Sequence, residues 1–201
     1  MITGKVRQAV GGCMRVFLDF EASSLSEDSY PIEVGWVFED GRSEGHLIRP
    51  APQWTEWDET AQALHGISRA RLEAEGVAHD VVAQRLLDVL SEHTVYASAP
   101  SWDGKWLSVL LRGAGLPRHA MRLKDSDEAH LDAALQILRP AMAVEKLRGA
   151  IGEVMERARE AAGNEPTHRA VEDAERERQI WLHVRRIAGE MARAAGSSRG
   201  S

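Results

Sequence analysis

The sequence predicts an α/β fold in which a mixed five-stranded sheet is flanked by helices, and three observations indicate this class. Apolar or alternating runs rich in strand-forming residues fill much of the first quarter of the chain. Strand-like and helix-like segments then alternate up to about residue 124. The C-terminal third carries only helical periodicity. We therefore expect three antiparallel strands, then parallel strands, and a helical C-terminal third.

Five segments carry the strand signal, namely residues 14–20, 32–38, 45–49, 94–99 and 121–124. The first is a short apolar run that ends at acidic residues, as a central strand would. The second alternates with a period of two, and Asp40 and Gly41 then signal the turn into the third. The first three segments therefore predict an antiparallel meander.

The helical signal is apolar spacing of three to four residues, interrupted by glycine and proline. Helices are expected in two short segments after Trp54 that Gly66 separates, and over residues 81–90, 103–113, 131–138, 141–162 and 169–194. Thr167, after Pro166, is a candidate N-cap for the last helix. The helix over residues 141–162 has no assigned role and suits packing, an oligomer surface or a docking site.

The composition indicates one globular domain, because 43% of the 201 residues are hydrophobic and 28% are charged. We expect this domain over residues 14–195, an N-terminal extension over residues 1–13 and a flexible tail over residues 196–201. No apolar run reaches the length of a membrane span, and the N-terminal segment lacks a signal-peptide pattern. A cytoplasmic protein without membrane contact is the expectation.

Cysteine content and charge exclude some classes of site. A single cysteine, Cys13, excludes an internal disulfide framework and a cysteine-rich zinc site. The net charge of −6 is not typical of proteins that bind nucleic acid broadly. Carboxylates that hold divalent cations nevertheless present a positive site once the metal is bound, so the acidic balance does not exclude a phosphate-containing substrate.

Asp19 and Glu21, in the context DFEASSL, form the first candidate motif. Residues two apart in a strand point to the same face, so these carboxylates are expected side by side at the end of the first strand. Two adjacent carboxylates repel each other unless a cation lies between them. The alternative is that they are ordinary polar residues at a strand end.

Asp103, His168 and Asp173 complete the candidate site. Asp103, in WDGKW, follows a strand and opens a helix, where a carboxylate is also favoured as an ordinary N-terminal residue. His168 and Asp173, in HRAVEDA, would not share a helix face. We therefore expect His168 in the loop that enters the last helix and Asp173 about one and a half turns inside it. A surface histidine before a solvated helix is the alternative.

Together these motifs resemble the histidine subclass of the DEDD exonucleases, the DnaQ-like 3′–5′ exonucleases of the ribonuclease H-like superfamily. DFEASSL is similar to the first motif of that family, LHGIS to the segment after its third strand, WDGKWL to its second motif and HRAVEDA to its third. The resemblance runs over residues 16–181 and includes the order of strands and helices. It implies a ribonuclease H-like fold.

The resemblance also implies an activity and a set of site residues. Asp19, Glu21, Asp103 and Asp173 would hold two Mg²⁺ or Mn²⁺ ions, and His168 would be the general base. The reaction would release 5′-mononucleotides from the 3′ end of single-stranded DNA or RNA. The residues implied to lie beside the terminal nucleotide are Ala22, Ser23, Leu25, His65 and Trp102. For His65, ending a short helix is an equal alternative.

Departures from the family pattern lie around the nucleotide. Ala99 stands where many members carry asparagine, Trp102 replaces a phenylalanine, and residues 22–24 replace the usual threonines and glycine. Because these residues lie around the nucleotide, the family resemblance does not define the substrate preference. Both DNA and RNA stay open as substrates. A non-catalytic nucleic-acid or protein-binding module is the main alternative function, and an endonuclease of the same superfamily is a weaker one. The sequence also leaves open whether the protein forms a homo-oligomer or binds a polymerase or another protein.

Overall fold

A computed structural model describes residues 12–163 and 165–197, so most of the expected N-terminal extension and tail lies outside the described residues. It contains a six-stranded mixed sheet in the order β4-β3-β2-β1-β5-β6. The strands are β1 (Arg15–Ala22), β2 (Pro31–Phe38), β3 (Ser43–Arg49), β4 (Val77–Ala78), β5 (Thr94–Ala97) and β6 (Leu123–Asp125). The first three strands are antiparallel, and β5 and β6 continue the sheet in parallel with β1. The expected α/β class, a mixed sheet in which antiparallel strands are followed by parallel ones, is confirmed.

Five strands were expected from the sequence, whereas the sheet has six, and β4 is the additional one. β4 has two residues and pairs in parallel with Ile48 and Arg49 at the end of β3. A two-residue strand cannot show a period of two, so its pairing depends on tertiary contacts and not on a local pattern.

Seven helices complete the described part of the chain. They are α1 (Glu59–His65), α2 (Arg69–Glu75), α3 (His79–Leu90), α4 (Pro100–Gly113), α5 (Ser126–Leu138), α6 (Val144–Ala162) and α7 (Ala170–Ser197). Gly66 separates α1 from α2 as expected, with a left-handed φ of 69°. α6 begins three residues later than expected, because Ala141 and Met142 still donate to the carbonyl of Leu138. α7 extends beyond residue 194 into the first part of the expected tail.

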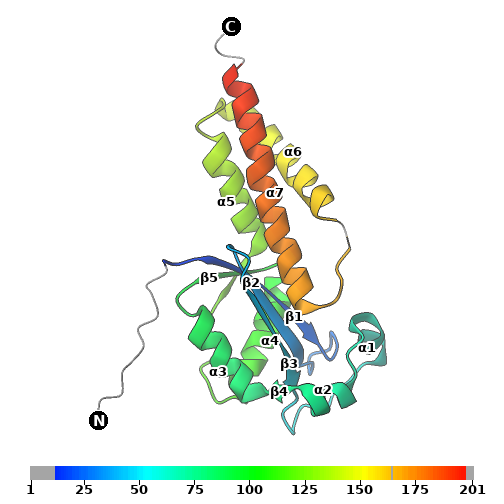
Figure 1. Cartoon of the computed structure of the whole chain (residues 1–201). Coiled ribbons are helices and arrows are strands. Elements are labelled where there is room, and N and C mark those ends of the chain that lie inside the picture. The colour runs from blue at the N-terminus through cyan, green and yellow to red at the C-terminus, as the bar shows by residue number, and fades with distance from the viewer. Residues whose placement is uncertain (1–11, 164, 198–201) are drawn as a thin grey trace, which may run out of the picture.

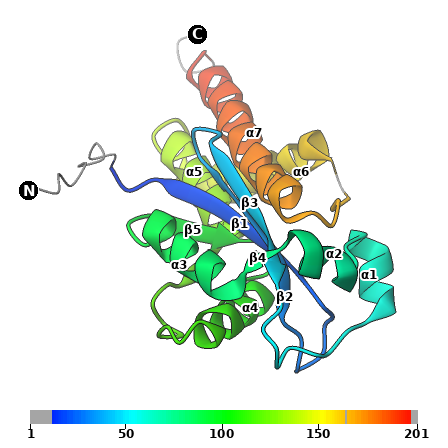
Figure 2. The same cartoon turned by 60° about the horizontal axis from the view of Figure 1, so that its bottom comes forward.

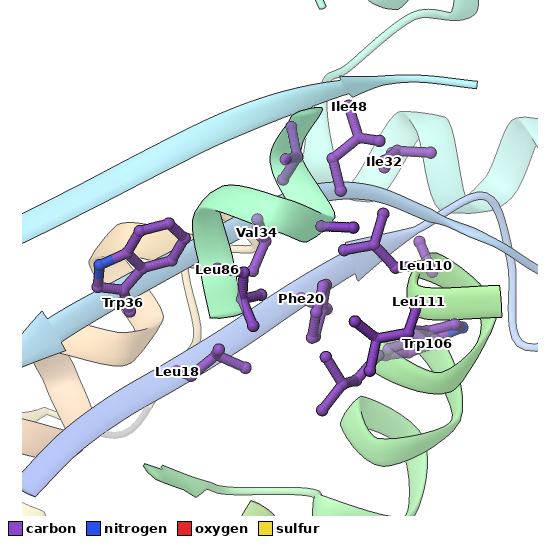
Figure 3. Close-up of a cluster of buried hydrophobic side chains, with 14 of the residues drawn as sticks. Leu18, Phe20, Ile32, Val34, Trp36, Ile48, Leu86, Trp106, Leu110 and Leu111 are labelled. Carbon is purple, nitrogen blue, oxygen red and sulfur yellow. The ribbon is translucent and has the colours of Figure 1, made fainter. Parts of the chain in front are cut away.

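Two hydrophobic cores lie on opposite faces of the sheet. α3 and α4 cover one face, and α5, α6 and α7 gather on the other and extend away from the sheet (Figures 1 and 2). Leu18 and Phe20 of β1 pack with Leu86, Leu110 and Leu111 in the first core (Figure 3). Phe17, which points the other way, packs in the second core with side chains of α5, α6 and α7. Because successive side chains of β1 point to opposite faces of the sheet, this strand contributes to both cores.

β2 is buried at all eight positions because helices cover both of its faces. The first turn of α7 packs directly on it, and a Cβ atom at Gly35 would clash with the backbone of Ala170 and Val171. This close approach sets the N-terminus of α7 against the centre of the sheet. No helix in the described ranges is both long and apolar enough to cross a membrane.

Candidate active site

Three of the predicted carboxylates meet at the junction of β1 and α7. Asp19 and Glu21 lie two residues apart on β1, and Asp173 lies in the first turn of α7, closer to its start than expected. One oxygen from each carboxylate lies within 4.8 Å of the others, so the three could hold a metal ion. Residues far apart in sequence are brought together because α7 packs across β1 and β2.

Asp103 lies behind this group and is almost fully buried, with 2% of its surface exposed. Its Oδ1 accepts from the backbone N–H of Phe20 at 3.3 Å, and its Oδ2 accepts from that of Ala99 at 3.3 Å. Because Ala99 is the N-cap residue of α4, Asp103 joins the end of β1 to the start of that helix. Both roles considered for Asp103, helix-terminal residue and member of the acidic group, are therefore compatible with its position.

The acidic group is electrostatically strained without a cation. Burial, followed by the charges of Asp103, Glu21 and Asp173, raises the pKa of Asp19 well above its usual value. Burial and then the charge of Asp173 raise the pKa of Glu21 to about 8. Burial also raises the pKa of Asp103 to about 7, although its backbone hydrogen bonds oppose the shift. A divalent cation would relieve this repulsion, so the donor set fits a hard, oxygen-ligated metal.

His168 lies in the loop before α7, as expected, and has a left-handed backbone with φ 56°. The residues on either side of it are fixed. The backbone N–H and hydroxyl of Thr167 donate to Oδ1 of Asp173 at 2.8 and 3.2 Å. The guanidinium of Arg169 donates to both oxygens of Glu33, at 2.8 and 3.2 Å. These two anchors hold His168 in a backbone conformation that costs a non-glycine residue roughly 1 kcal/mol or more.

The expectation that Thr167 caps α7 was wrong. Its hydroxyl acts as a donor to Asp173, and the first N–H of the helix, that of Ala170, is accepted by Oε2 of Glu33 at 3.0 Å. A carboxylate at a helix N-terminus satisfies a free donor and interacts favourably with the helix dipole. The cap therefore comes from β2, a segment that sequence proximity does not indicate.

A cleft of about 300 Å³ contains Asp19, Glu21 and Asp173, and Asp103 lies outside its lining. Its lining residues are Asp19, Phe20, Glu21, Ala22, Ser24, Leu25, Ala61, Leu64, His65, Ser98, Trp106, Pro166, His168, Asp173, Arg176 and Glu177. The set includes His168 and three of the five residues implied to bind the nucleotide. Leu25 and Leu64 are its large exposed hydrophobic side chains, at 69% and 61%.

The other two implied nucleotide contacts, Ser23 and Trp102, lie outside the lining of the cleft. Ser23 is buried and donates from Oγ to Oε2 of Glu56 at 2.6 Å. Trp102 packs against Trp106, with ring centroids 5.6 Å apart, and Trp106 is the tryptophan that lines the cleft.

His65 is the last residue of α1 and also lines the cleft, so the two interpretations of this residue are compatible. Its Nδ1 accepts from the backbone N–H of Ile67 at 3.0 Å, which places the proton of the neutral ring on Nε2. Burial lowers the pKa of His65, and the nearby His168 acts in the same direction while Glu33 opposes it. Nε2 is buried without a hydrogen-bond partner among the described residues. His65 thus offers the cleft an unused donor.

Solved structures share this fold. The chain aligns with the zinc-bound form of the E. coli exonuclease I complex with single-stranded DNA at a TM-score of 0.59 and 16% identity, over 84% of this chain and 39% of that one. Exonuclease I from Methylocaldum szegediense aligns at a TM-score of 0.53 and 14% identity, over 64% of this chain and 30% of that one. This is an exonuclease I-like fold. The chain spans about two fifths or less of the length of these proteins. No protein-family model matches the sequence, and no curated protein matches it.

Three charged residues near the cleft were missed from the sequence. Glu177 and Arg176 line it, and Glu33 anchors its histidine loop. Glu177 is four residues after Asp173 and therefore on the same helix face, a spacing that could have revealed it. Glu33 was detectable as the charged residue of an otherwise apolar strand, because a buried carboxylate needs a partner.

Proposed function

We propose that this protein is a metal-dependent nuclease of the DEDDh type that removes nucleotides from the 3′ end of single-stranded nucleic acid. The observation that carries the proposal is the meeting of Asp19, Glu21 and Asp173 in one cleft with His168. The fold shared with exonuclease I, which has been solved with single-stranded DNA, supports it.

Asp19, Glu21, Asp103 and Asp173 would hold two Mg²⁺ or Mn²⁺ ions. One oxygen from each of Asp19, Glu21 and Asp173 lies within 4.8 Å of the others, and the buried Asp103 accepts a hydrogen bond from the backbone of β1 at Phe20. Oxygen ligands of this kind suit both cations. When bound, such ions would neutralise charge on the phosphodiester and make a water molecule more acidic.

His168 would accept a proton from the attacking water while the water oxygen bonds to phosphorus. The bond between phosphorus and the 3′ oxygen of the preceding nucleotide would break, and that oxygen would take up a proton. The products are a 5′-mononucleotide and a chain that is one nucleotide shorter. An imidazole suits this role because its ordinary pKa lies near neutral pH.

The terminal nucleotide would lie against the apolar side of the cleft. Leu25 and Leu64 offer exposed apolar contacts for a base, and Ala22 lines the wall beside them. The Nε2–H of His65 would donate to an oxygen of the sugar or phosphate. Ser23 and Trp102 would support the cleft indirectly, through the loop after β1 and through Trp106.

The test is digestion of 5′-labelled single-stranded DNA and RNA oligonucleotides of the same sequence with Mn²⁺, resolved to single nucleotides. We expect shortening from the 3′ end, loss of cleavage in EDTA with recovery on adding Mn²⁺, and loss of at least roughly 100-fold in kcat for Asp19→Asn, since it removes a charge from the metal site. Asp132→Asn, an exposed change on α5, is the matched control. Full activity in chelator would exclude the mechanism.

Two further measurements, thermal unfolding with Mn²⁺ and digestion of a circular single strand, would favour the alternative functions. Thermal stabilisation by Mn²⁺ without release of nucleotides would indicate a binding module. Cleavage of a circular single strand would indicate an endonuclease, because a circle has no 3′ end.

A further inference from the structure

The cleft is strongly acidic, although its proposed substrate is a polyanion. Asp19, Glu21, Asp173 and Glu177 line it, and Asp103 lies behind them. Arg176 is the single lysine or arginine among the described residues of the lining. Because the guanidinium keeps its charge at all relevant pH values, it is the permanent positive group in this cleft.

Arg176 is held in place at two atoms. Its Nε donates to the carbonyl of Gly163, just after α6, at 3.1 Å, and its Nη1 donates to Oε1 of Glu177 at 3.3 Å. Glu177 is 8% exposed and fixed in turn, because its Oε2 accepts from the hydroxyl of Ser126 at 2.6 Å. The Nη2 group makes no hydrogen bond with any described residue. An arginine already held at Nε and Nη1 loses little entropy when its Nη2 group binds an oxyanion.

The position of Arg176 relates it to the proposed reaction. It lies three residues after Asp173 on α7, which places both side chains on the same face of the helix. Its side chain is one quarter exposed, so solvent reaches it.

We propose that Arg176 binds a phosphate of the nucleic-acid strand in the cleft and contributes to substrate affinity. This inference rests on the proposed function. A fixed cation beside the carboxylates offsets the repulsion between an acidic cleft and a polyanion. The alternative is that Arg176 serves only to neutralise the buried charge of Glu177.

The experiment compares Arg176→Ala with wild type on a short oligothymidylate in Mn²⁺ at several salt concentrations. A charge-assisted hydrogen bond corresponds to a factor of roughly 10 to 100, so we expect KM to rise by at least about 10-fold while kcat changes by less than about 3-fold. The slope of log affinity against log salt should fall by about 0.7, the value for one phosphate contact to a single strand. Arg186→Ala, which removes the same charge from an exposed site on α7, is the matched control.

The double variant Arg176→Ala, Glu177→Gln separates the two roles. If Arg176 only neutralises Glu177, removing both charges restores the wild-type KM and salt slope, and the proposal is wrong. If Arg176 binds phosphate, the defect persists in the double variant. An unchanged KM and slope in Arg176→Ala would also overturn it.

Binding of a fluorescent oligothymidylate, measured by anisotropy, keeps this inference distinct from the nuclease activity. If the wild-type protein binds but releases no nucleotide, the nuclease proposal fails, and weaker binding by Arg176→Ala still supports the phosphate contact. If the wild-type protein neither binds nor cleaves, both proposals fail.

Discussion

At the scale of single residues, the acidic group shows a conflict between stability and function. Burial and mutual repulsion raise the pKa values of Asp19, Glu21 and Asp103 together, so the metal-free protein keeps protons that ordinary carboxylates would lose. Clustered like charges of this kind are typical of functional sites. A divalent cation that took the place of the protons would relieve their cost.

The pH dependence of stability follows from Glu21. Between its usual pKa of 4.5 and the raised value of about 8, the folded protein holds a proton that the unfolded chain releases. The stability of the metal-free protein should therefore fall as pH rises through this range. In EDTA at pH 8, we expect Glu21→Gln to melt a few degrees above wild type, since roughly 1 kcal/mol corresponds to about 2–4 °C at this size.

The measurement is thermal unfolding from pH 5 to pH 8, with and without Mn²⁺. Mn²⁺ should flatten the pH dependence of wild type and have little effect on Glu21→Gln. Glu27→Gln, a change at an exposed loop position, should behave as wild type. If the unfolding temperature in EDTA falls equally with pH for wild type and for Glu21→Gln, Glu21 does not titrate as stated.

At the scale of elements, the junction between β2 and α7 positions the histidine loop. Glu33 accepts the first N–H of α7 and pairs with Arg169, while Gly35 lets the helix backbone approach the strand. The partners in this junction are about 136 residues apart in sequence. This short segment of β2 thus fixes the start of the C-terminal helix.

Glu33→Ala should disturb this junction more than an ordinary ion pair would. It leaves a buried N–H and a partly buried guanidinium without their acceptor, so we expect a loss of about 2–4 kcal/mol in unfolding free energy. Glu44→Ala on the neighbouring strand β3 breaks an exposed pair with Arg85 of α3 and a partly exposed one with His46, and should cost about 1 kcal/mol or less. Urea unfolding gives both values, and similar losses for the two variants would contradict this role of Glu33.

The local elements were largely predictable from the sequence, and the long-range contacts were not. The five longer strands and the helices showed periodicity that depends only on neighbouring residues, as in residues 32–38 of β2. β4 is too short for a period, and the start of α6 depends on a turn at Leu138. The acidic motifs could be grouped through a family resemblance, whereas the contacts of Glu33 with Arg169 and of Arg176 with Gly163 needed coordinates, because packing brings these partners together.

At the scale of the whole molecule, α7 is common to the acidic cleft and the second core. Its first turn carries Asp173, and further along it Trp181 and Val184 pack with α5 and α6. Figure 1 shows this helix running from the sheet to the far end of the helical group. Damage to the second core should therefore be transmitted to the acidic cleft through a single rigid element.

Leu138→Ala, in the fully buried part of α5, tests this coupling. We expect a loss of about 2–5 kcal/mol, and one urea transition in which far-UV circular dichroism and nuclease activity decline together. Leu131→Ala on the same helix removes the same atoms from a side chain that is 42% exposed and should change stability by about 0.5 kcal/mol or less. Two separate transitions would show that the helical group folds independently.

The left-handed backbone at His168 has a consequence for chemical rescue. Glycine adopts a φ near 56° without steric cost, so His168→Gly should relax the loop and leave a space the size of the imidazole ring. We expect this variant to be at least as stable as His168→Ala, to bind Mn²⁺, and to regain part of its lost turnover when free imidazole is added. Rescue should follow the concentration of neutral imidazole as pH is varied. Stable, metal-bound protein that no small base restores would argue that the histidine does more than accept a proton.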